Sequence, residues 1–170
     1  MTRRTLICAA VALLLAGGCK PKPKPVTSLQ RKEAAALMQE AQFAQSVRDP
    51  ARAEGLLAQA VALCGDNGDY WLELGRVRAR SGNRSGAKSA YESAADAYRA
   101  EAAASEAKNG AQVVLRQIYT LALLGRVDEA RALLAKAQKD RPDNRDVRAF
   151  AETKQLDRLL TSPAFKETAL

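Results

Sequence analysis

The cysteines have the most reactive side chains in this sequence, and histidine, which would normally activate them, does not occur. Histidine is the commonest general base and metal ligand, so its absence excludes Ser-His and Cys-His nucleophilic catalysis. Cys8 and Cys19 lie within and directly after an N-terminal apolar run, which leaves Cys64 as the single cysteine further along the chain. We therefore expect no disulfide in the folded part. We expect Cys64 to be a small buried apolar residue, with a redox thiol as the alternative.

Residues 1–18 have the layout of a secretory signal peptide. They contain a basic start at Arg3 and Arg4, an apolar run over residues 6–16, and two glycines before Cys19. The run has about eleven apolar residues, whereas a helix that crosses a hydrocarbon core needs about 20. We therefore expect export, rather than a permanent membrane span.

The sequence Leu-Ala-Gly-Gly-Cys at residues 15–19 resembles the lipobox of bacterial lipoproteins. In that family the thiol receives diacylglycerol, the leader is cut directly before it, and the new amine is acylated, with palmitate a usual chain. The resemblance implies lipid attachment at Cys19, although Ala16 stands where the family most often has Leu; plain signal cleavage nearby is the alternative. Stable anchoring takes more than one acyl chain. Lys20, a residue other than Asp, implies sorting to the outer membrane if the host has two membranes.

Residues 19–28 are expected to be a tether between the lipid and the domain. Lysine and proline alternate over residues 20–25, and such a run excludes helix and favours extended polyproline II. A solvated spacer is one interpretation. Attraction of the lysines to anionic lipid is the other.

The composition predicts an all-α domain. The chain has 170 residues, 47% of them hydrophobic and 5% aromatic, so its core must be built mainly from Ala and Leu, which favour helix. The net charge of +8 would suit nucleic acid, but the basic residues are scattered among acidic ones. We expect no nucleic-acid partner.

Small and aromatic residues in the middle of the chain follow a regular spacing: Trp71, Leu74, Gly75, Ala87 and Tyr91. This spacing resembles the tetratricopeptide (TPR) repeat, a 34-residue helix-turn-helix unit. Its small residues let two antiparallel helices approach closely while the large ones fill the space around the crossing. It is a packing pattern, so the resemblance implies an α-solenoid of antiparallel helix pairs that acts by binding.

Weaker copies of the pattern predict about three TPR hairpins, at about residues 34–67, 68–101 and 111–144. The second helix of the central repeat is expected to overrun, covering residues 87–108, because it has neither Gly nor Pro. A capping helix at about 145–160 is expected to cover the last apolar face.

The folded domain, residues 29–170, is predicted to begin with a helix capped by Ser28. Asp49 and Pro50 have the residue types that start a second helix, since Asp accepts from free N–H groups and Pro needs no donor in the first turn.

In TPR domains the first helices of successive repeats line a concave groove that accepts a peptide or a partner's helix. The resemblance places these residues in the groove: Met38, Gln42, Leu72, Arg76, Arg80, Leu115, Arg116 and Tyr119. Three guanidinium groups beside apolar surface suit a protein partner with an acidic and apolar segment. The alternative is that these arginines are solvated and serve solubility.

The leading interpretation is a membrane-anchored TPR scaffold or adaptor that mediates protein–protein interactions in the bacterial cell envelope. An assembly factor is one protein of this kind. A passive structural or self-assembling envelope lipoprotein is the alternative. An envelope enzyme would depend on carboxylates, yet the candidates lie at turns and helix starts, where capping alone accounts for them: Asp128, Glu129, Asp143 and Asp146. We expect no catalytic residues, metal, cofactor or small-molecule substrate.

Overall fold

The computed structural model describes residues 25–104 and 110–170, and in these ranges the chain is all-α. The predicted fold class is confirmed, since the helices of these ranges pack in neighbouring pairs as in a solenoid. The predicted signal peptide at residues 1–18, Cys19 and most of the tether lie outside the described residues. Among the helices of the described ranges, none has the length and apolar character that crossing a membrane requires.

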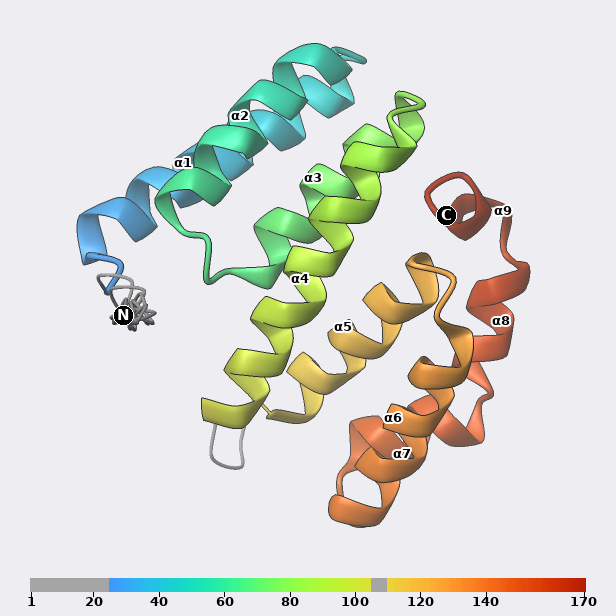
Figure 1. Ribbon diagram of the computed structural model, residues 1–170. Helices are drawn as coiled ribbons and strands as arrows, with labels where there is room; N and C mark the ends of the chain where they lie inside the picture. The colour runs from blue at the N-terminus through green and yellow to red at the C-terminus, as the bar shows by residue number, and fades with distance from the viewer. Residues whose placement is uncertain (1–24, 105–109) are drawn as a thin grey trace, which may run out of the picture.

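The helices form three hairpins followed by a group of shorter helices (Figure 1). Their bounds are α1 (Ser28–Ser46), α2 (Pro50–Leu63), α3 (Gly68–Arg80), α4 (Arg84–Ala104), α5 (Gly110–Leu123), α6 (Val127–Asp140), α7 (Arg145–Glu152), α8 (Gln155–Thr161) and α9 (Pro163–Lys166). Short turns join α1 to α2, α3 to α4 and α5 to α6, which makes the helices of each pair antiparallel.

Helix starts in the first hairpin follow from local hydrogen bonding. The N-cap of α1 is Thr27 and not Ser28 as predicted, because Thr27 and Gln30 form a reciprocal capping box. Asp49 caps α2 as predicted, and Pro50 occupies its first turn.

The α3–α4 hairpin is packed through two glycine–tyrosine contacts. A Cβ atom placed on Gly75 would lie 2.4 Å from the ring of Tyr91, and one on Gly68 would lie 2.5 Å from the ring of Tyr98. Both distances are shorter than any real Cβ contact, so each tyrosine ring lies directly on a glycine backbone. The two glycines are two turns apart on α3, as are the two tyrosines on α4. The close approach therefore extends along the hairpin.

The bounds of two predicted helices differ from those in the structure. The helix expected over residues 87–108 is α4, whose described part ends at Ala104, and residues 105–108 lie outside the described residues. The single capping helix expected at about 145–160 is wrong, because α7 and α8 are separate helices. Lys154 between them adopts the left-handed conformation, with φ of 48°.

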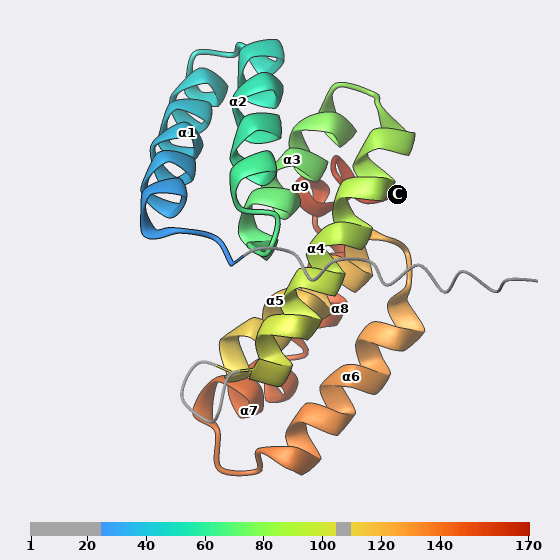
Figure 2. The same cartoon turned by 60° about the vertical axis from the view of Figure 1, so that its left-hand side comes forward.

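Alanine supplies much of the core, as the composition predicted. Fully buried alanines occur in each hairpin: Ala41, Ala44, Ala53, Ala60, Ala87, Ala90, Ala94 and Ala130. Trp71 packs against both the apolar cluster of the first two hairpins and the larger cluster that continues to α9. The hairpins are thereby joined into one array, and α9 folds back beside the α3–α4 hairpin instead of extending from α8 (Figure 2).

Candidate peptide-binding surface

The eight residues predicted to line a groove lie on α1, α3 and α5, and the structure brings part of them together. Leu72 is buried, and the half-buried Leu115 and Tyr119 pack in the same apolar cluster. Met38 packs in a separate cluster with the first hairpin, and Gln42 is exposed. The apolar part of the predicted surface is therefore concentrated on α3 and α5.

The three predicted arginines each have an acceptor within the protein. The guanidinium of Arg76 donates to Glu73 at 2.8 Å, and that of Arg80 donates to the amide oxygen of Gln45 at 3.0 Å. Arg116 donates to the carboxylate of Asp69 at 2.8 Å. Two of the three positive charges are thus paired with carboxylates, so Arg80 is left as the strongest attractor for an acidic segment.

Asp69, which sequence reasoning did not select, joins α3, α4 and α5. Its carboxylate accepts from the hydroxyl of Tyr98 at 2.5 Å as well as from Arg116. Burial, and then this hydrogen bond, raise the pKa of Tyr98 well above the ordinary tyrosine value. The sequence signal was the position of Asp69 in the first turn of α3, but that position suggests only a helix-dipole role.

Residues 163–170 cover the end of the predicted surface. Phe165 is buried and meets Tyr119 edge to face, with ring centroids 5.8 Å apart. The buried hydroxyl of Tyr91 donates to the carbonyl of Thr168 at 2.8 Å. The amide of Leu170 donates to the carbonyl of Leu123 at 2.9 Å. The sequence predicted no element after the capping helix, so these contacts were not predicted, although a Phe two residues after Pro163 is consistent with an apolar contact.

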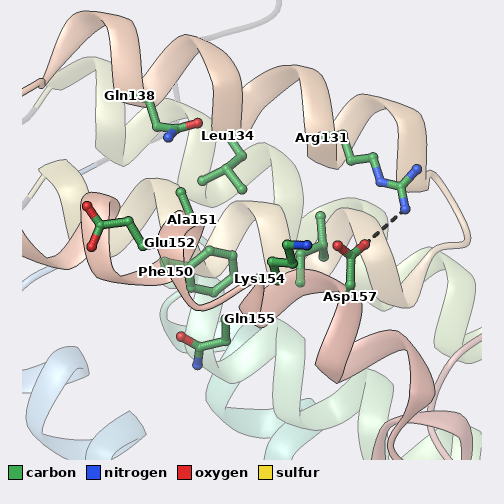
Figure 3. A pocket seen from close by; sticks show the side chains of 10 residues that line it. Arg131, Leu134, Gln138, Phe150, Ala151, Glu152, Lys154, Gln155 and Asp157 are labelled. Carbon is green, nitrogen blue, oxygen red and sulfur yellow. Dashed lines mark hydrogen bonds and ion pairs between the residues drawn. The ribbon is translucent and has the colours of Figure 1, made fainter.

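A hollow of about 360 Å³ lies between α6 and the α7–α8 pair (Figure 3). Arg131 and Asp157 form an ion pair of 3.0 Å across it, and both side chains are more than half exposed to solvent. A solvated pair of this kind adds little stability. The hollow is therefore a solvent-filled gap between neighbouring helices.

The carboxylates weighed for catalysis lie at helix starts. Asp128 and Glu129 are in the first turn of α6, and Asp146 is in the first turn of α7. Arg126 pairs with Glu129 and lowers the pKa of that carboxyl. Asp143 lies in the turn between α6 and α7. Over the described ranges, no cluster of three or more metal-binding side chains is present.

Cys64 is buried, as predicted, with 1% of its surface exposed at the end of α2. Burial raises the pKa of its thiol. A neutral, inaccessible thiol is a poor nucleophile. The residue therefore packs as an apolar side chain.

The class of protein that the fold defines is an all-α array of helix hairpins. In comparisons with family models, curated proteins and solved structures, the chain matches none.

Proposed function

We propose that the protein is a membrane-anchored, TPR-like scaffold that binds a protein partner in the bacterial cell envelope. Acting as an assembly factor is one form of this function. The observation that supports this most directly is the contact of Gly75 with the ring of Tyr91. It joins the two helices of the hairpin at the positions where the TPR pattern has its small and large residues. Such arrays present extended surfaces and act by binding.

The surface on α3 and α5 suits a segment that is partly apolar. The half-buried Leu115 and Tyr119 supply apolar area, and Arg80, whose hydrogen-bond partner is a neutral amide, can pair with a carboxylate of the partner. A guanidinium that already pairs with a carboxylate, such as Arg116, contributes less.

Attachment to the membrane is proposed from the leader and Cys19, which lie outside the described residues. The lysines and prolines over residues 20–25 would hold the domain clear of the head groups. Because α1 begins at Ser28, little chain separates this tether from the array.

In-cell crosslinking followed by mass spectrometry tests the binding function. Arg80→Glu reverses the charge of the least neutralised arginine, so it should reduce the yield of the main crosslinked partner several-fold. Lys88→Glu makes the same charge change on the exposed side of α4 and is the matched control. Equal partner yields from the parent and both variants would contradict the proposed surface.

A self-assembling lipoprotein is the second candidate function, and one observation favours it. Three large apolar side chains on α1 and at its C-terminal end are strongly exposed: Leu29 and Phe43 in the helix, and Val47 directly after it. The mass in solution of a Cys19-deleted chain distinguishes the two candidates. A dimer or larger assembly that Phe43→Glu returns to monomer would support self-assembly, whereas a monomeric parent would support the adaptor.

A further inference from the structure

Residues 163–170 satisfy groups of the hairpin array that the array does not satisfy by itself. The hydroxyl of Tyr91 is fully buried and has the carbonyl of Thr168 as its acceptor. The carbonyl of Leu123 belongs to the last turn of α5, where helical carbonyls lack an intrahelical donor, and the amide of Leu170 supplies one. Arg84, the first residue of α4, donates to the carbonyl of Ala169.

The segment itself has the character of a bound peptide. Its helix α9 has 4 residues, far too few to be stable alone. Its contacts with the array come from the ring of Phe165, from the buried side chain of Thr168, from Ala169, which packs against the main apolar cluster, and from backbone groups. Lys166 and Glu167 point into solvent, and one extended residue, Ser162, connects the segment to α8. An array-binding segment of another protein could make every one of these contacts.

The segment also lies on the surface to which the proposed function assigns a partner. Phe165 packs in the same apolar cluster as Leu72, Leu115 and Tyr119, three of the residues predicted to line the groove. Arg76 and Arg80 are close enough to Tyr91 to affect its pKa.

We propose that residues 163–170 are a displaceable internal ligand, and that the partner presents a peptide segment of the same chemistry in their place. This inference rests on the proposed function and specifies its ligand. The partner's peptide would need an aromatic side chain that packs against Tyr119. Three residues later it would need a free backbone carbonyl for Tyr91, and five residues later a backbone N–H for Leu123.

The buried hydroxyl of Tyr91 determines which ligands can compete. A competing peptide that covered this hydroxyl without offering an acceptor would leave the donor buried and unpaired, and such a loss is costly. A competing peptide must therefore supply a carbonyl at that point, in addition to apolar area. Arg80 is close enough to Tyr91 to affect its pKa, so an acidic residue of the peptide near that carbonyl could pair with Arg80.

Competition between the internal segment and a free peptide can be measured directly. A segment joined by a short connection has an effective concentration of about millimolar, so it should weaken the binding of a free peptide strongly. The probe is a fluorescent synthetic peptide of residues 161–170, titrated into the full chain and followed by anisotropy. Phe165→Ala should bind this peptide at least about tenfold more tightly than the parent does, because the internal copy loses its aromatic anchor.

Two further variants sharpen this experiment. Lys166→Ala changes an exposed residue of the same segment and should bind the peptide as weakly as the parent. Adding Tyr119→Ala to Phe165→Ala should remove the gain. Equal binding by the parent and Phe165→Ala would overturn the proposal, and so would no binding by a Phe165→Ala chain whose helical circular dichroism is unchanged.

Hydrogen exchange on the parent chain tests the same inference without any substitution. The amides of Thr168, Ala169 and Leu170 should exchange by local opening, at least about tenfold faster than the core amides of α3 and α5. If they exchange as slowly as the core, the segment is a fixed part of the fold and the proposal is wrong. Neither readout needs a cellular partner, so a chain that binds the peptide and captures no envelope protein would contradict the proposed function alone.

Discussion

At the scale of single residues, Gly75 is the position where the hairpin packing can be tested most directly. Gly75→Ala would place a methyl group 2.4 Å from the ring of Tyr91, and this ring is fully buried. We expect a loss of about 1–3 kcal/mol in the free energy of unfolding, as for other overpacked cores. Urea unfolding followed by circular dichroism measures it.

Gly55 provides the matched control for this substitution. It lies within α2, and a Cβ there would meet nothing within 4 Å. Gly55→Ala should therefore stabilise the protein by about 0.5–1 kcal/mol through helix propensity alone. Opposite signs for the two substitutions are the expected result, and a stabilising Gly75→Ala would contradict the packing described for α3 and α4.

The two buried tyrosines make stability depend on alkaline pH. In the folded chain the pKa values of Tyr91 and Tyr98 are raised above the ordinary tyrosine value, and burial is the largest cause. Below about pH 10 both tyrosines are protonated in the folded and in the unfolded chain, so their full contribution to the free energy of unfolding is present. Above about pH 10 the tyrosines ionise first in the unfolded chain, so the free energy of unfolding falls as the pH rises. We expect a loss of about 1 kcal/mol for each tyrosine between pH 10 and pH 11.

Phenylalanine variants identify the source of this pH dependence. Tyr91→Phe and Tyr98→Phe each remove one ionisable hydroxyl, so each should flatten the decline of the free energy of unfolding above about pH 10. The slope is the readout, because the loss of a hydrogen bond to Thr168 or Asp69 lowers stability at every pH. Slopes identical to that of the parent would show that other groups cause the decline.

Sequence reasoning succeeded for residues whose partners the repeat spacing fixes. Gly75 and Tyr91 were predicted to share a helix crossing, and they are in contact. The contact of Gly68 with Tyr98 and the link from Asp69 to Arg116 were not predicted, because neither belongs to the repeat pattern. The link from Asp69 to Arg116 also depends on where α5 lies relative to α3, and the spacing within one hairpin does not specify that.

At the scale of elements, the break between α7 and α8 is the feature that sequence patterns did not predict. The segment contains neither Gly nor Pro, so helix propensity favours one continuous helix. Lys154 nevertheless has φ of 48°, a conformation that costs a residue with a side chain about 1–2 kcal/mol. The break lets Phe150 of α7 and Leu156 of α8 both be buried in the main core. Tertiary packing overrides local preference here.

Lys154→Gly should relieve this conformational cost. Glycine adopts positive φ freely, and after its greater unfolded-state entropy is subtracted we expect a gain of about 0.5–1 kcal/mol in the free energy of unfolding. Arg148→Gly is the control, since Arg148 is exposed and lies within α7, and there glycine should cost about 1 kcal/mol. A Lys154→Gly variant that loses as much as Arg148→Gly would show that α7 and α8 are continuous in solution.

At the scale of the whole molecule, the order of the helices could be predicted and the path of the C-terminal segment could not. The positions of the hairpins along the chain follow from the hydrophobic period, the helix caps and the turn residues. All of these are local signals in the sequence. The return of residues 163–170 to α3, α4 and α5 depends on contacts across the whole array, such as that of Thr168 with Tyr91, which are 77 residues apart. The predicted groove residues were therefore chosen without the segment that covers part of them.

The proposed anchor makes the location of the whole molecule depend on one thiol. Cys19→Ser removes the predicted acylation site while leaving the lysines of residues 20–25, so it separates lipid from electrostatic attachment. We expect the parent to stay in the membrane fraction through a high-salt wash, because acyl chains hold by apolar burial that salt does not screen. Cys19→Ser should appear in the soluble fraction, and the intact mass of the parent should exceed that of its cleaved chain by the mass of its acyl groups. Cys64→Ala, at a buried cysteine, should leave the fractionation unchanged. Salt-resistant membrane association of Cys19→Ser would show that something other than this lipid anchors the protein.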